Sequence, residues 1–252
     1  MPKIFTCSTG RCGTKFAAWV FRTYTDAPAF HEPDPKLCGP DAEEINAGNI
    51  TEGTQKRIDQ KFKFIEDNTK DGQYFEGSNM WIKSWAGLAM ERWPEDVGIF
   101  RLRRDLAGYL ISFTRRGKRG RKGRFHSAFL IDPTAKGNVL QGYPGMSFYE
   151  TVAWNYFEVE ARYLKIRETA YRFFEMDFKD IGITRAWAHL FDTFEIPHRL
   201  PAHFPETPDR HQSIFDDKGK IACLDHLKEN WGEPRTPIDA KTWLKLKGDP
   251  KQ

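Results

Sequence analysis

The segment that most constrains this chain is residues 8–14, with the sequence Ser-Thr-Gly-Arg-Cys-Gly-Thr. An extended apolar run at residues 4–7 precedes it, and a helix-compatible run follows from Lys15 to Phe21. Glycines let the backbone bend and approach an anion, and a first helical turn offers free N–H groups and the positive end of the helix dipole. The order strand, glycine turn, helix therefore predicts a phosphate-binding turn.

This turn is not a Walker A loop, which needs a glycine, four residues, and then Gly-Lys-Ser/Thr. Here Gly13 is followed by Thr14 and Lys15, and Gly10 is too close to Gly13. The lysine and Mg²⁺ arrangement that binds a nucleoside triphosphate is therefore missing. An ordinary strand-to-helix turn is the alternative interpretation of these seven residues.

Length and hydropathy restrict the class of protein. A chain of 252 residues can hold one large α/β domain or two small ones. No apolar run approaches the roughly 20 residues of a membrane helix, so we expect no membrane span. The chain starts Met-Pro-Lys and enters the first predicted strand directly, so we expect no signal peptide.

The four cysteines, Cys7, Cys12, Cys38 and Cys223, form no Cys-x-x-Cys pair and have no His or Cys partner at metal-ligand spacing. We expect no metal site, and free thiols in a reducing cytoplasm. Cys12 lies at a helix N-terminus, where a thiol can become reactive, although a small polar turn residue is the simpler interpretation.

One segment makes the net charge of the chain positive, because without its seven basic residues the net charge would be −3 (32 basic against 35 acidic residues). The net charge is +4, and residues 115–124 contain seven basic side chains separated by glycines: Arg115, Arg116, Lys118, Arg119, Arg121, Lys122 and Arg124. We predict a flexible basic loop here. Three roles stay open: it could grip nucleic acid or another polyanion, close over an anionic cofactor, or be a solvated loop.

Periodicity and turn residues predict alternating strands and helices. The predicted strands are residues 4–7, 73–76, 97–102 and 171–176, and the predicted helices are residues 14–24, 51–68, 79–93, 106–114, 148–169 and 184–194. Pro94 should end the third of these helices, and Asp105 should cap the fourth. This alternation indicates an α/β fold with a parallel sheet, which we expect to be one domain with a core at about residues 1–197 and a peripheral tail at about residues 198–252.

Four further residues are candidates for the site. Arg104 follows a predicted strand and Ser112 lies in the next helix, where both side chains could bind one phosphate. Glu32 lies in the loop after the first helix and could accept a proton from an attacking hydroxyl, and His31 could do the same near neutral pH. Taken singly, each is better explained as an ordinary surface or loop residue.

Together these residues resemble the sulfotransferases that use 3′-phosphoadenosine 5′-phosphosulfate (PAPS). Residues 10–14 look like the family's 5′-phosphosulfate loop, and the Arg104-to-Ser112 spacing looks like its 3′-phosphate motif. Glu32 follows the loop at about the distance of the catalytic Glu in some members, and residues 173–181 resemble a further family segment. The resemblance spans about residues 1–197 and implies a three-layer α/β/α fold with a central parallel sheet, of the P-loop nucleotide-binding type.

The resemblance implies in-line sulfuryl transfer from PAPS to an acceptor hydroxyl, leaving 3′-phosphoadenosine 5′-phosphate (PAP). It assigns the 5′-phosphosulfate to Arg11, Cys12, Gly13, Thr14 and Lys15. Arg104 and Ser112 would bind the 3′-phosphate. Glu32 would be the general base, with His31 in reserve, and Arg11 would offset charge on the leaving oxygen.

The chain departs from the family pattern at three places. Cys12 stands where Ser is usual, and Lys15 stands where a second Thr is common. Residues 77–79, Gly-Ser-Asn, replace a common Lys-Thr-Pro, so a family lysine is absent there; Lys83 is the candidate substitute. The acceptor class is open, although the basic loop would suit an anionic one.

Two other classes of protein stay open. A P-loop kinase or similar nucleotide-dependent transferase would need Mg²⁺ and ATP, and the missing Gly-Lys-Ser/Thr argues against it. A nucleic-acid-binding or polyanion-binding protein would act through residues 115–124 and lose affinity steeply with salt. Few aromatic residues lie among those charges, so nucleic acid is the weaker of these interpretations.

Overall fold

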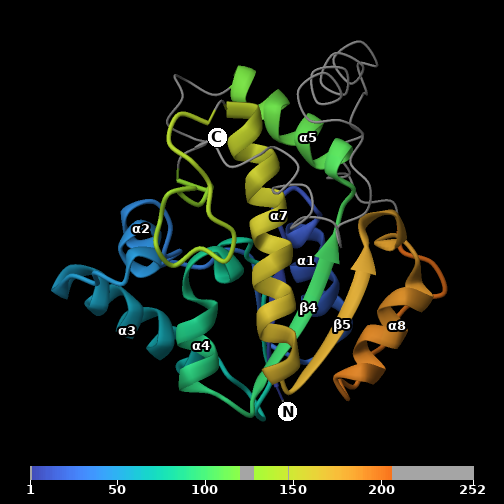
Figure 1. Cartoon of the computed structure of the whole chain (residues 1–252). Coiled ribbons are helices and arrows are strands. Elements are labelled where there is room, and N and C mark those ends of the chain that lie inside the picture. Colours follow the sequence, from blue (N-terminus) through green and yellow to red (C-terminus); the bar gives the residue numbers. More distant parts are fainter. Residues whose placement is uncertain (1, 120–127, 147, 206–252) are drawn as a thin grey trace.

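The computed structural model describes residues 2–119, 128–146 and 148–205 (Figure 1). The strands are β1 (Lys3–Cys7), β2 (Ala29–Phe30), β3 (Tyr74–Glu76), β4 (Val97–Arg103) and β5 (Arg172–Asp177). The α-helices are α1 (Thr14–Tyr24), α2 (Pro40–Ala47), α3 (Glu52–Asp67), α4 (Ala86–Arg92), α5 (Leu106–Arg119), α7 (Phe148–Ile166) and α8 (Thr184–Thr193). A π-helix, η1 (Trp81–Trp85), precedes α4, and two 3₁₀ turns, η3 (Arg167–Thr169) and η4 (Phe178–Asp180), flank β5.

The strands form one parallel sheet in the order β2-β3-β1-β4-β5. The chain leaves β1 toward β2 on one side and leaves β4 toward β5 on the other. The point where the direction of winding reverses therefore lies between β1 and β4. In open α/β sheets, ligands bind at this point, beyond the carboxyl ends of the strands. Residues 8–14 follow β1 at this edge, and Arg104 follows β4.

Helices cover both faces of the sheet, which confirms the predicted α/β/α architecture (Figure 1). One buried cluster packs Phe5, Ile99 and Tyr74 against residues of η1, α4, α5 and α7. A second cluster packs Phe100 and Met176 against α1 and α8 on the opposite face. Strand β1 is buried along its whole length, because its side chains point alternately into these two cores.

The main predicted elements are present, with the ends shifted by a few residues. The side chain of Thr51 caps α3, and the carboxylate of Asp105 accepts a hydrogen bond from the Gly108 N–H (2.7 Å), as predicted for the start of α5. The prediction missed β2 and α2. The predicted helix at 79–93 was wrong in form, since its first half is a π-helix, although it ends before Pro94 as expected.

The prediction of a loop at residues 115–124 was wrong for residues 115–119. Helix α5 continues to Arg119, so the first basic residues are helical. The physical reason is that Arg and Lys favour helix nearly as well as alanine, and a single glycine costs only about 1 kcal/mol. Residues 120–127 lie outside the described part of the chain, as does most of the predicted tail, residues 206–252.

Gly77, directly after β3, allows the sheet to approach α1 closely. A β-carbon at this position would lie 2.5 Å from the carbonyl oxygen of Thr14, the first residue of α1. We expect Gly77→Ala to destabilise the fold by about 1–3 kcal/mol, because backbone would have to move. Chemical unfolding measures this directly. Gly87→Ala in α4 is the control, because a β-carbon there meets nothing within 4 Å and alanine favours helix.

Candidate functional site

The turn between β1 and α1 has an unusual backbone conformation. Three of its residues have positive φ: Gly10 at 90°, Arg11 at 59° and Gly13 at 88°. The hydroxyl oxygen of Ser8 accepts a hydrogen bond from the Gly10 N–H (3.1 Å), which fixes the first half of the turn. Turns that combine left-handed with right-handed residues can direct successive N–H groups toward one concave side, where an anion can bind.

The N-terminus of α1 differs from those of α3 and α5. Gly13 provides no side-chain cap, and the first turn of α1 contains no acidic residue. By contrast, Thr51 caps α3 and Asp105 lies against the start of α5. The positive end of the α1 dipole is therefore not compensated by a cap or by an acidic side chain of its own first turn, which favours an anionic ligand at this place.

Arg104 and Ser112 meet the loop at Arg11. The Nη1 of Arg104 donates a hydrogen bond to the Arg11 carbonyl oxygen (2.9 Å), and the Nε of Arg11 donates to the Ser112 hydroxyl oxygen (3.2 Å). Arg104 and Ser112, which follow Arg11 in the sequence by 93 and 101 positions, thus both contact it. The sequence analysis placed Arg104, Ser112 and the loop in one site, and their shared binding of a phosphate stays a prediction.

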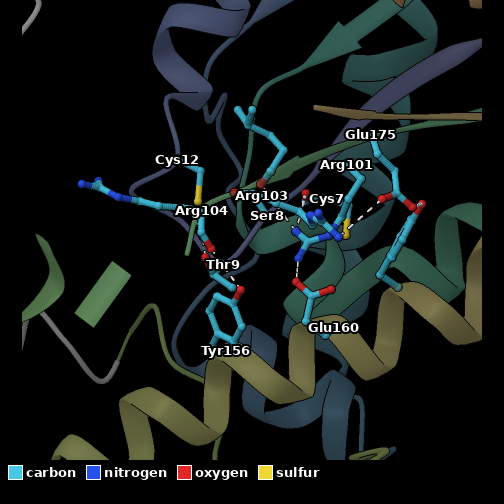
Figure 2. A network of polar contacts seen from close by, with 12 residues as sticks. Cys7, Ser8, Thr9, Cys12, Arg101, Arg103, Arg104, Tyr156, Glu160 and Glu175 are labelled. Carbon is cyan, nitrogen blue, oxygen red and sulfur yellow. Dashed lines mark hydrogen bonds and ion pairs between the residues drawn. The ribbon is translucent and has the colours of Figure 1, made fainter. Parts of the chain in front are cut away.

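Two neighbours hold Arg104 in position. The hydroxyl of Tyr156, on α7, donates to the Arg104 carbonyl oxygen (3.0 Å), a contact that can be followed in Figure 2. The guanidinium carbon lies 4.6 Å from the centroid of the Phe178 ring, at cation–π distance. Ile181 and Phe178 also pack beside Gly13, where a β-carbon would lie 2.4 Å from Ile181 Cδ1. The segment after β5 therefore contacts both Arg104 and the loop.

His31 and Glu32 lie over the same loop. The Nε2 of His31 is 3.3 Å from the hydroxyl oxygen of Thr14, the first residue of α1. Glu32 accepts a hydrogen bond through Oε1 from the Nδ2 of Asn79 (3.0 Å), whose side chain packs beside Gly10. Burial lowers the pKa of His31, which favours the neutral imidazole that can accept a proton. Glu32 has a φ of 47°, a conformation that costs energy for a residue with a side chain.

Cys12 is unsuited to be a reactive thiol. Its side chain is fully buried, and its Sγ donates to the Gly10 carbonyl oxygen (3.1 Å) and lies 3.4 Å from the Thr9 hydroxyl oxygen. Burial raises the pKa of the thiol, opposite to the effect expected at a helix N-terminus. Of the two interpretations drawn from the sequence, the buried and hydrogen-bonded side chain favours the simpler one, a small residue that stabilises the turn.

A buried ion pair supports the strand ends below the loop. Arg101 of β4 pairs with Glu160 of α7 and donates to the Cys7 carbonyl oxygen at the end of β1 (3.0 Å) (Figure 2). Both side chains are almost completely buried. This pair ties α7 to the two central strands directly under the site.

The structure also places Lys83, which the sequence analysis could only name. Lys83 lies in η1 with its side chain buried beneath the loop, and its Nζ donates to the Thr9 carbonyl oxygen (2.8 Å). Lys15, by contrast, is exposed on α1. No sequence pattern predicted the Lys83 contact, because an irregular helix sets the direction of its side chain.

Other features of the described residues lie apart from this site. A cavity of about 360 Å³ between β5 and α8 is lined by Arg103, Asp177 and His189 among others, but by none of the predicted site residues. Within the described ranges, no group of three or more His, Cys, Asp or Glu side chains could hold a metal ion. No helix among these residues is long and apolar enough to cross a membrane.

No protein-family model matches the chain, and no curated protein matches it. Among solved structures, the chain is similar to a sulfotransferase from Alicyclobacillus acidocaldarius, at 14% sequence identity and a TM-score of 0.48. The match covers 97% of this chain and 99% of that one.

Proposed function

We propose that this protein is a sulfotransferase that moves a sulfuryl group from PAPS to an acceptor hydroxyl. The observation that supports this most is the meeting of Arg104, Ser112 and the loop at Arg11. A cofactor with phosphate groups at both its 5′ and 3′ positions needs two anion sites close together. The loop and the start of α1 suit one of them, and the Arg104–Ser112 pair suits the other.

The loop residues would bind the 5′-phosphosulfate. Backbone N–H groups of residues 11–14 and the α1 dipole favour negative charge there, as does the Thr14 hydroxyl. Because the Cys12 side chain is buried, its contribution would come from its N–H group. Arg11 and Lys15 would offset the charge that builds on the bridging oxygen as the sulfur–oxygen bond breaks.

Glu32 would act as the general base. PAPS supplies the electrophilic sulfur; the acceptor oxygen forms the new bond to it while its proton passes to the Glu32 carboxylate. The Asn79 hydrogen bond orients that carboxylate toward the loop. Asn79 Oδ1 is buried and has no hydrogen-bond partner among the described residues. His31 stays the reserve base.

Loss of the Arg104 guanidinium is expected to weaken PAP binding. Arg104→Ala removes a charge-assisted contact of about 1.5–3 kcal/mol, or roughly 10- to 100-fold in affinity. A ligand at 100 times its dissociation constant stabilises the native state by about 2.7 kcal/mol, so wild-type protein should melt several degrees higher with PAP. At the same PAP concentration, that shift should fall to about half in the variant if affinity drops tenfold, and to roughly a sixth if it drops 100-fold.

Arg92→Ala is the matched control for this measurement. Arg92 is an exposed arginine of α4 that pairs with Glu66 (2.8 Å), on a helix that carries none of the proposed site residues. It should keep the full PAP shift. An unchanged shift in Arg104→Ala would contradict the assignment of the 3′-phosphate to this side chain.

A further inference from the structure

Lys83 is a buried cation placed directly against the loop. It lies at the centre of the π-helix η1 with 1% of its surface exposed. Its Nζ donates to two carbonyl oxygens, those of Thr9 and Phe129, each at 2.8 Å. The amine thus joins the loop after β1 to the segment that begins at residue 128. Single-turn π-helices inside α-helices occur often at functional sites.

The backbone of Lys83 is held from the other side. Its carbonyl oxygen accepts hydrogen bonds from Asn46 Nδ2 (2.9 Å) and Arg162 Nη1 (2.7 Å). Arg162 also pairs with Glu158 (2.6 Å), one turn earlier on α7. These contacts to the carbonyls of η1 fix the direction in which the Lys83 side chain leaves the helix.

The charge of Lys83 is poorly compensated. Among the described residues, no carboxylate forms a hydrogen bond or an ion pair with its ammonium group. The ionisable groups that act on it are Cys12 from the loop, Glu32 from the loop after β2, and Arg162 from α7. Lys61 shows the contrast, since that equally buried lysine pairs with the carboxylate of Glu76 (2.9 Å).

We propose that Lys83 is a positioning residue that takes up a proton when an anion binds to the loop. This inference rests on the proposed function for the place of the anion, and it adds the group that senses it. The protonated amine makes charge-assisted hydrogen bonds to the Thr9 and Phe129 carbonyls, which are stronger than those of the neutral amine. Anion binding and the ordering of these two segments would therefore support each other.

The direction of the pH effect follows from burial. Desolvation lowers the pKa of Lys83 to about 7, so the free protein loses this charge near neutral pH. A neighbouring anion favours the charged form and raises that pKa. If the rise is about one unit, anion affinity should weaken by about fivefold from pH 7 to pH 9, where phosphate groups with a pKa near 6 are already ionised.

The direct test follows the lysine ¹³Cε resonances of the whole protein by NMR as pH is varied. One lysine should titrate near pH 7, and its midpoint should move up by about one unit when PAP or inorganic pyrophosphate is added. That resonance should be absent in Lys83→Met. Lys63→Met, the same change at an exposed lysine of α3, should leave it in place. Calorimetry in two buffers should show about half a proton taken up per PAP at pH 7.5, and none in Lys83→Met.

The outcomes separate this inference from the proposed function. If PAP binds while no lysine midpoint moves, proton uptake by Lys83 is wrong and the sulfotransferase proposal stands. If pyrophosphate moves the midpoint but PAP does not bind, the inference stands and the cofactor is wrong. If no lysine titrates below pH 9 in the free protein, or if neither anion moves the midpoint, the inference is overturned. All of these outcomes are measured on the wild-type protein, so the test remains valid even if Lys83→Met does not fold.

Discussion

Glu32→Gln is expected to lower kcat for sulfuryl transfer by roughly 10²- to 10⁴-fold, the usual contribution of a general base. The glutamine side chain can still accept the hydrogen bond from Asn79, so the loop geometry should be kept. The KM for PAPS should change little, because the carboxylate acts on the acceptor's proton. Steady-state kinetics of sulfuryl transfer from PAPS measures both kcat and the KM for PAPS.

Asp34→Asn is the matched control for this variant. Asp34 is an exposed carboxylate two positions from Glu32, so its neutralisation should leave kcat nearly unchanged. If His31 rather than Glu32 is the general base, His31→Gln should be the variant that loses activity. The pKa of His31 is lowered, so a reaction that uses its neutral form should slow only when pH falls below the ordinary histidine range. A large loss in His31→Gln with full activity in Glu32→Gln would contradict the proposed role of Glu32.

Lys61→Met is expected to cost about 3–5 kcal/mol of stability, the usual effect of removing one partner from a buried ion pair. Lys61 on α3 and Glu76 at the end of β3 are almost completely buried and lie 2.9 Å apart. Burial lowers the pKa of Lys61 and raises that of Glu76, so each depends on the other for its charge. Without the lysine, Glu76 would be left as an uncompensated buried carboxylate. The melting temperature should fall by roughly 10 °C.

Lys61 also contacts the loop that carries His31 and Glu32. Its Nζ donates to the carbonyl oxygen of Pro33 (3.1 Å), the residue after Glu32. Because this bond anchors the loop that carries both candidate bases, Lys61→Met should also reduce turnover in the remaining folded protein.

Two controls isolate the buried pair. Lys63→Met removes an exposed lysine of the same helix that pairs with Asp67 at the surface, and it should cost less than about 1 kcal/mol. The double variant Lys61→Met/Glu76→Gln should recover much of the lost stability, because the neutral amide needs no counter-charge and its oxygen can still accept from the Tyr74 hydroxyl, as Glu76 does (2.8 Å). A loss below about 1 kcal/mol in the single variant would contradict this account.

Part of this arrangement could be predicted from the sequence because local rules determine it. The run into Ser8, the glycines at 10 and 13 and the helix from Thr14 specify strand, turn and helix through backbone preferences alone. Asp105 marks the start of α5 by the same kind of local rule. The parallel sheet follows from the alternation of such elements, and parallel strands bring their carboxyl ends to one edge.

The remaining features depend on tertiary contacts. Strand β2 has two residues, too few for any periodic pattern, and it forms because it pairs with β3. The π-helix around Lys83 is sustained by Arg162, whose side chain comes from 79 positions away. The environment of Cys12 also depends on tertiary packing: a helix N-terminus alone would lower the pKa of its thiol, but burial raises it.

The most direct test of the central claim compares the binding of PAP, adenosine 5′-monophosphate and ATP with Mg²⁺ to the wild-type protein by calorimetry. PAP and the monophosphate differ only in the 3′-phosphate, which Arg104 and Ser112 would bind. The account predicts that PAP binds roughly 10- to 100-fold more tightly than the monophosphate, and that Arg104→Ala removes this difference. Equal binding of PAP and the monophosphate, or binding of ATP with Mg²⁺ alone, would contradict it.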